Sequence, residues 1–380
     1  MFQQQHGKEN AIAEVASSVR YLWRHRPGNE VVAAIQDTID NLALTTKDGR
    51  KPVVCARRKT AHGWHLVLKL PPGISFNKVK RLREFFADAT NAWIDMKWEG
   101  GNMHMDIHVG QLPTSVAYQW DPEPYPRMSL PVPIGVSQRG LEVFDLAESP
   151  HLLVAGVPGF GKSNLLHVLI HSLLPRAFVA VIDFKRLEFA YLKQFAAVTR
   201  KEKDGLALMY ALNQEMERRI DVLEAAGCVK IQEYSGEMPF IVLVVDEVAE
   251  IKSDELLGLV DRIVRLARAV GISVVAATQR PSTTVLPGDT RAMFAGRLCY
   301  QVADELNSRM VLGETCNLAA HLPGIKGRGI FKYGLSEREI QTMYLPLDQA
   351  QGLLRSLPKR GCINYELPKP KPQTKGLTAR

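Results

Sequence analysis

The 380-residue chain has no long hydrophobic run and few cysteines. Its apolar runs fall short of the ~20 residues that a membrane helix needs, so we expect no integral membrane segment. Residues 1–10 are polar and unlike a signal peptide, which favours a cytoplasmic protein. The five cysteines are scattered, and none forms a C-x-x-C pair. This spacing argues against a zinc ribbon and against a disulfide framework.

What is present is typical of a soluble globular protein. The chain is 46% hydrophobic and 23% charged, and its length suffices for two or three domains. The formal net charge of +8 favours a polyanionic partner such as nucleic acid, although many enzymes are equally basic. Composition therefore indicates a soluble, basic globular protein, and the function has to be inferred from sequence motifs.

A glycine-rich segment predicts phosphate binding. It follows the spacing G-x-x-x-x-G-K-[ST] and consists of Gly156, Val157, Pro158, Gly159, Phe160, Gly161, Lys162 and Ser163. The apolar run 151–155 before it predicts a buried strand, and the run from Asn164 to 174 predicts a buried helix. A strand, a glycine loop and a helix in this order form a phosphate cradle, since backbone N–H groups and the helix N-terminus face the anion. We therefore expect Lys162 to contact ATP phosphates and the Ser163 hydroxyl to bind Mg²⁺.

Three further strands are expected to end beside this loop. The run 240–245 is continuously apolar and ends in Asp246 and Glu247, which indicates a buried parallel strand with acids at its carboxyl end. Asp246 is the candidate Mg²⁺ ligand, and Glu247 the candidate group that polarises the attacking water. The strand predicted at 272–277 leads to Gln279, a candidate γ-phosphate sensor, and the strand at 178–182 leads to Asp183-Phe-Lys185.

The order of these segments predicts an α/β fold with five regions. We expect an N-terminal helical segment at 1–45, with helices near 11–23 and 31–42, and a small α/β domain at 46–112. In that domain we expect a helix over 76–92 and a hairpin around Gly100-Gly101. The rest of the chain is expected to form a proline-rich linker at 113–135, an ATPase core at 136–357 with a mainly parallel sheet flanked by helices, and a basic, disordered tail at 358–380.

The segment from about 130 to 331 resembles the motor of the FtsK/SpoIIIE family of DNA translocases. Beyond the glycine loop, the resemblance lies in Ile182-Asp-Phe-Lys185, Glu215-Met-Glu-Arg-Arg219, Ala267-Arg-Ala-Val-Gly-Ile272 and above all Ala277-Thr-Gln-Arg-Pro-Ser282. It implies a RecA-like P-loop ATPase core, assembled as a homo-hexameric ring that moves double-stranded DNA with ATP and Mg²⁺.

The resemblance also implies residue roles. Lys162 and Ser163 match the phosphate and Mg²⁺ positions, Asp246 and Glu247 the metal and water positions, and Gln279 the sensor. Arg268 matches the arginine finger that reaches the ATP of the next subunit; on spacing alone it is also compatible with an exposed helix arginine. Arg280 matches the start of a DNA-facing loop, and Arg291 and Arg297 are further candidates without a matching motif.

Several features depart from the family pattern. Phe160 replaces a small residue, and the segment 284–291 lacks an expected lysine. We expect neither the N-terminal membrane helices of cell-division members nor a C-terminal winged-helix module. The small domain loosely resembles the N-terminal module of coupling-type members in mobile elements.

Three functions stay open at this point. The first is a duplex DNA translocase serving transfer, replication or packaging, with recruitment to other transfer or replication proteins. The second is a RecA-like replicative helicase, although no wedge element is recognisable. The third is an assembly or coupling ATPase that moves protein cargo.

Overall fold

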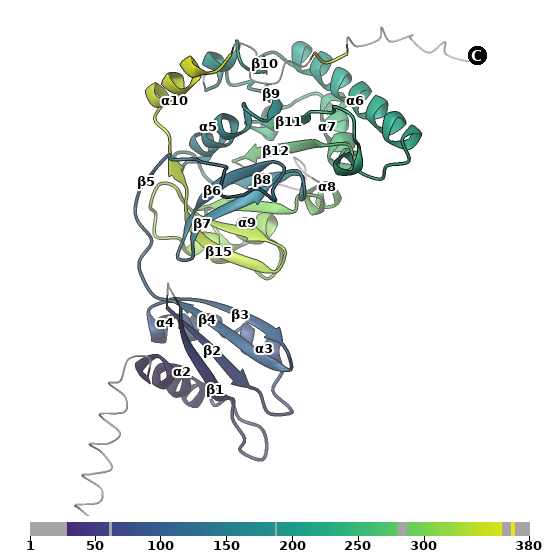
Figure 1. Ribbon diagram of the computed structural model, residues 1–380. Coiled ribbons are helices and arrows are strands. Elements are labelled where there is room, and N and C mark those ends of the chain that lie inside the picture. The colour runs from purple at the N-terminus through teal and green to yellow at the C-terminus, as the bar shows by residue number, and fades with distance from the viewer. Residues whose placement is uncertain (1–28, 61–62, 187, 280–286, 359–365, 369–380) are drawn as a thin grey trace, which may run out of the picture. The chain divides into compact units, whose positions relative to one another are not determined.

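The computed structural model describes residues 29–60, 63–186, 188–279, 287–358 and 366–368 (Figure 1). The chain divides into two compact units, Met1–Gln111 and Leu112–Arg380. In the parts described, none of the helices combines the length and the apolar character needed to cross a membrane. The helix expected near 11–23 and most of the expected tail lie outside the described residues.

The first unit is an antiparallel sheet with helices. Its strands, in the order β1-β2-β4-β3, and its helices are β1 (Val53–Thr60), β2 (Gly63–Lys69), β3 (Trp93–Glu99), β4 (Asn102–His108), α2 (Asn29–Asn41), α3 (Phe76–Lys80) and α4 (Arg83–Thr90). Alternate residues of β2 and β4, such as Leu66, Met103 and Met105, are fully buried against the helices. The predicted hairpin is confirmed: Gly100 and Gly101 take positive φ angles of 56° and 77°, which two-residue hairpin loops favour.

The prediction of one helix over 76–92 is wrong at its centre. The chain forms two helices, α3 and α4, separated at Arg81 and Leu82. The amide of Leu82 donates to the carbonyl of Val79, a three-residue bond that tightens the turn and interrupts the α-helical ladder. Val79 of α3 and Phe86 of α4 are both buried in the core of this unit. A single straight helix was expected to bury both side chains.

The second unit is built on a ten-stranded sheet in the order β10-β9-β11-β12-β8-β13-β14-β15-β6-β7. The strands are β6 (Pro131–Ser137), β7 (Gly140–Asp145), β8 (Leu152–Ala155), β9 (Ala177–Ile182), β10 (Ala197–Thr199), β11 (Phe240–Val245), β12 (Ile272–Thr278), β13 (Gly296–Tyr300), β14 (Arg328–Tyr333) and β15 (Ser336–Gln341). Pairing is parallel from β10 to β13 and antiparallel from β13 to β7. The sheet is therefore mixed, with the parallel half expected of a RecA-like core.

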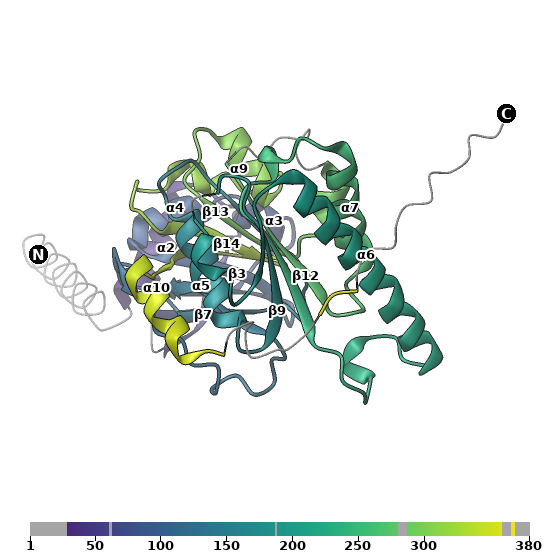
Figure 2. The ribbon, with the colours of Figure 1, turned by 90° about the horizontal axis from the view of Figure 1, so that it is seen from above.

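Helices cover both faces of this sheet. The α-helices are α5 (Lys162–Leu173), α6 (Glu202–Ala225), α7 (Asp254–Leu266), α8 (Gly288–Ala292), α9 (Glu305–Leu312) and α10 (Leu347–Leu353). Helix α5 carries the chain from β8 across to β9, whereas α6 and α7 bring it back toward β12. Because such crossovers are right-handed, the two directions place α5 and the α6–α7 pair on opposite faces (Figure 2).

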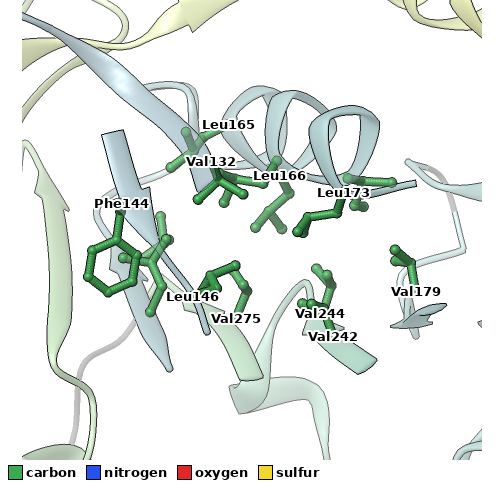
Figure 3. Packing of buried hydrophobic residues seen from close by; sticks show 14 of the residues in the cluster. Val132, Phe144, Leu146, Leu165, Leu166, Leu173, Val179, Val242, Val244 and Val275 are labelled. Atoms are coloured by element: carbon green, nitrogen blue, oxygen red, sulfur yellow. The ribbon is translucent and has the colours of Figure 1, made fainter. Parts of the chain in front are cut away.

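The main core lies between α5 and the sheet. Leu166 and Leu173 point from α5 toward Val242 and Val244 of β11, and Leu165 lies beside Val132 of β6 (Figure 3). These residues are wholly buried, and each such side chain contributes about 1.5–3 kcal/mol to stability through its burial. The packed core fixes the first turn of α5, and with it the glycine loop, against the ends of the parallel strands.

The proline-rich stretch at 113–135 contains regular structure. Strand β5 (Val116–Ala117) pairs in parallel with β16 (Met343–Tyr344), and β6 starts at Pro131 inside the large sheet. Strand β6 pairs with β15 through one residue pair, Val136 and Gln341. Prolines in the first half of β6 therefore remove few ladder hydrogen bonds from the sheet.

Replacing Arg219 by alanine should lower the free energy of unfolding by about 3–5 kcal/mol, the cost of breaking a buried ion pair. Its side chain is fully buried, and Nε donates to Glu215 at 2.7 Å. Nη1 and Nη2 donate to the carbonyls of Val270 and Pro239 at 2.9 and 2.8 Å, tying α6 to the residues before β11 and β12. Chemical denaturation would measure the loss.

Arg218→Ala is the matched control, because Arg218 pairs with the same glutamate while its side chain is 51% exposed. We expect it to cost less than about 1 kcal/mol. Equal effects of the two substitutions would contradict the role of burial.

Candidate nucleotide-binding site

The glycine loop has the conformation of a phosphate cradle. Gly156, Gly159 and Gly161 have φ angles of 145°, 84° and 114°, which residues with a Cβ rarely adopt. A Cβ on Gly156 would lie 2.6 Å from the Cβ of Tyr300, so a side chain does not fit there. The amide of Val157 donates to Gln301 at 3.0 Å, which fastens the loop to the end of β13. Helix α5 then begins at Lys162, and its free N-terminal amides face the loop.

Lys162 lies within this loop. Its side chain is buried, and Nζ donates to the carbonyls of Gly156 at 2.5 Å and Val157 at 3.1 Å. Burial lowers the pKa of Lys162 to about 8, and the nearby Glu247 carboxylate opposes this shift. A buried ammonium held by two neutral carbonyls lacks a full counter-charge, and a phosphate oxygen would supply one.

Phe160, the residue that departs from the family pattern, is half-buried and packs against the main core. Its carbonyl accepts a hydrogen bond from the amide of Gly327 at 2.9 Å. The aromatic residue therefore fits this loop by reaching the core.

Asp246 and Glu247 follow the last residue of β11, and both are buried. Within the described residues, the Asp246 carboxylate makes no hydrogen bond or ion pair. Burial raises the pKa of Asp246 to about 6, and Lys185 nearby opposes this shift. Such an uncompensated carboxylate has oxygens available to a cation.

The donor set fits Mg²⁺. Carboxylate and hydroxyl oxygens are the hard ligands that Mg²⁺ takes, and in nucleotide sites it is held by one or two protein groups plus phosphates. Asp246 offers such oxygens at the strand end, and Ser163 is half-buried in the first turn of α5. These two residues would hold the ion, as the sequence predicts.

Glu247 is held by two donors. Lys185 Nζ lies 3.2 Å from Glu247 Oε2, and the amide of Gln279 donates to Oε1 at 3.0 Å and to Oε2 at 3.2 Å. Gln279, the expected γ-phosphate sensor, thus contacts Glu247 through its backbone amide. Sequence reasoning assigned no role to Lys185, although its position after a predicted strand, in Asp183-Phe-Lys185, was the signal available.

The sheet order brings these residues to one edge. Strands β9, β11, β12 and β8 are neighbours and parallel, with Val245 in register with Ile182 and Thr278 with Ala155. Their carboxyl ends therefore carry Lys185, the acid pair, Gln279 and the glycine loop side by side, at the edge where α/β proteins bind ligands.

Arg268 lies away from this edge. It is exposed in the turn between α7 and β12, at the amino end of β12. A seven-residue strand separates it from Gln279, a distance of about 20 Å at 3.3 Å per residue. Its guanidinium makes no hydrogen bond or ion pair to another residue in the described ranges. Arg268 is thus exposed and too far to meet the site of its own chain.

The candidate DNA contacts are less well placed. Arg280 lies outside the described residues. Arg291 donates to the carbonyl of Met310 at 2.9 Å, and Arg297 donates to that of Val311 at 3.2 Å. Both carbonyls belong to the last turn of α9. These two guanidinium groups therefore stabilise the end of a helix.

The two shifted pKa values predict how ATP hydrolysis depends on pH. As pH falls through about 6, Asp246 becomes protonated and loses the charge that binds a cation. As pH rises through about 8, Lys162 loses the charge that binds phosphate. We expect kcat/KM to follow a bell with limbs near these values, since it reports the groups of the free enzyme.

Steady-state assays at constant ionic strength would give the profile, with melting temperature followed over the same range. A flat profile over a fully folded pH range would contradict these assignments.

Three comparisons place the chain among known proteins. Residues 117–240 match the family model described as FtsK/SpoIIIE family. DNA translocase FtsK of Treponema pallidum is 36% identical over 212 residues, covering 50% of this chain and 26% of the relative. DNA translocase FtsK of Chlorobaculum tepidum is 31% identical over 275 residues, covering 64% of this chain and 34% of the relative. The chain thus spans about a quarter to a third of the length of these relatives.

Solved structures share the fold. The pCW3 conjugation coupling protein TcpA, in a monomer form with ATPγS, superposes with a TM-score of 0.61 at 24% identity, covering 86% of this chain and 99% of that one. The cytoplasmic domain of the Type VII secretion ATPase EccC from Thermomonospora curvata superposes with a TM-score of 0.54 at 26% identity, covering 67% of this chain and 34% of that one. The solved structures show the shared fold, and the family model and the two relatives show that the chain contains a domain of the FtsK/SpoIIIE family.

Proposed function

We propose that this chain is an ATPase that moves double-stranded DNA, working as a hexameric ring. The observation that carries the proposal is the convergence of the glycine loop, Asp246 and Glu247 at one edge of the parallel sheet. An acid pair with a buried, hydrogen-bonded glutamate is suited to ATP hydrolysis. A protein that only switches between nucleotide-bound and nucleotide-free states does not need such a pair. Relatives that are DNA translocases supply the expectation that duplex DNA is the substrate.

In the proposed mechanism, the amides of the loop and of α5 bind the phosphates of ATP, with Lys162 at the β- and γ-phosphates. Mg²⁺, held by Ser163 and Asp246, would neutralise phosphate charge. Glu247 accepts a proton from the water that attacks the γ-phosphorus, and the bond to the β-phosphate oxygen breaks. Gln279, which joins Glu247 to β12, would relay the state of the nucleotide along the chain toward Arg280.

Arg268 supports assembly of more than one copy, and the hexameric ring is what the family resemblance implies. One chain cannot bring this arginine to its own nucleotide, so a complete site requires a neighbouring copy. The amino end of β12 on one subunit would face the carboxyl edge of the sheet on the next. Arg280 and the net charge of +8 support DNA as the polymer, and the fold shared with a conjugation coupling protein favours transfer of a mobile element as the setting.

A triplex-displacement assay tests this function. A motor that tracks along duplex DNA displaces a third strand bound to that duplex, and it does so only with ATP. We expect displacement by the wild-type protein and none by the Glu247→Gln variant. Unwinding of a forked duplex without triplex displacement would instead support the helicase.

Transport of protein cargo is the second candidate, favoured by the likeness to a secretion ATPase at 26% identity. For that function, ATP hydrolysis would be indifferent to duplex DNA and the triplex would persist.

A further inference from the structure

Lys185 contacts the group that the proposed function makes catalytic. Its Nζ lies 3.2 Å from Oε2 of Glu247, whose side chain is 4% exposed, while the Lys185 side chain is 31% exposed. The lysine therefore reaches from the solvent-facing rim of the site to a buried carboxylate. The amide of Gln279 is the second donor to that carboxylate.

The two donors approach Glu247 from different strands. Strand β11 lies between β9 and β12 in the sheet. Lys185 follows β9, and Gln279 follows β12, so each neighbour of β11 contributes one donor. A glutamate has three rotatable side-chain bonds, and one hydrogen bond leaves its carboxylate plane free to turn. Donors from both sides fix that plane.

The loop that presents Lys185 is itself fixed. The buried Asp183 carboxylate accepts from the amides of Arg186 at 2.8 Å and Phe189 at 3.3 Å, which closes the turn around Lys185. Arg186 has a φ of 66°, in the left-handed region that side chains disfavour. Backbone in this region is strained and persists where the surroundings impose it, often at functional sites.

We infer that Lys185 is a positioning residue for ATP hydrolysis: it orients the Glu247 carboxylate toward the attacking water. Its ion pair occupies Oε2 together with the Gln279 amide, whereas Oε1 accepts only from that amide among the described residues. Oε1 therefore keeps a lone pair for the water proton. The inference rests on the proposed function, since it assumes that Glu247 activates water.

The test is a double-mutant cycle between Lys185 and Glu247. Lys185→Met keeps the length of the side chain and removes the charge. We expect it to lower kcat by about 10²-fold, the loss typical of a misplaced catalytic group, and to leave the affinity for ATPγS unchanged. Lys185→Arg should restore most of kcat, because it keeps a charged donor. In a Glu247→Gln background, Lys185→Met should cause no further loss.

Each other outcome has a distinct meaning. Lost ATPγS affinity, or losses that multiply in the double variant, would mean that Lys185 acts on the nucleotide directly and would overturn the inference. An unchanged kcat would also overturn it. Lys193→Ala, which removes an exposed lysine downstream on the chain, is the matched control, and melting temperatures verify folding. A wild-type protein that does not hydrolyse ATP would refute the proposed function instead.

Discussion

Replacing Lys162 by alanine should reduce ATP turnover by about 10³-fold or more, the scale of loss when a group that stabilises transition-state charge is removed. Nζ of this lysine lies inside the glycine loop, bonded to the carbonyls of Gly156 and Val157. These carbonyls would release it to the phosphates when ATP binds. Turnover by the purified variant, measured at saturating ATP, would test the expectation.

The fold of the Lys162→Ala variant should persist. Burial disfavours the charged lysine, as its lowered pKa shows, so removing the side chain relieves that penalty while it breaks two hydrogen bonds. We expect a small change in melting temperature. Lys230→Ala, at an exposed lysine before β11, is the control and should turn over ATP normally. Normal turnover by Lys162→Ala would refute the nucleotide site.

Replacing Arg268 by alanine should lower kcat by about 10³–10⁵-fold, the contribution of an arginine finger, while ATPγS binding persists. The reason is its place at the amino end of β12, remote from its own Gln279 and Glu247. The arginine would stabilise charge only at the site of a neighbouring subunit. Arg262→Ala is a suitable control, because Arg262 is a half-exposed arginine of α7, the helix that precedes Arg268, and it pairs with Glu217.

Mixing variants tests the trans arrangement directly. Lys162→Ala subunits carry an intact Arg268, and Arg268→Ala subunits carry an intact glycine loop. Neither is active alone, but adjacent copies of the two would form complete sites. We therefore expect partial recovery of turnover on mixing. An Arg268→Ala protein that no longer binds ATPγS would show that the arginine supports its own subunit instead.

The glycine loop and the acid pair could be predicted from the sequence because their chemistry depends on contiguous residues. Gly156 to Ser163 follow a strand and open a helix, so neighbouring residues specify the site. The run before Asp246 is apolar throughout, which indicated its burial between parallel neighbours.

Contacts between strands distant in sequence could not be predicted. Lys185 and Glu247 meet because β9 and β11 are adjacent, and local periodicity contains no information on strand order. Similarly, Arg219 and Glu215 lie in one family motif, whereas the carbonyls of Val270 and Pro239, to which Arg219 also donates, lie on separate segments. The α3–α4 break arises from a local turn at Leu82 that the apolar spacing did not indicate.

The most direct test of the central claim is ATP hydrolysis by the purified protein without DNA, with duplex DNA and with single-stranded DNA. We predict strong stimulation by duplex DNA, weakened by salt because phosphate contacts release counterions. Glu247→Gln should reduce turnover to a small residual rate under all three conditions. Turnover that responds to neither form of DNA, or to single strands alone, would contradict a duplex translocase.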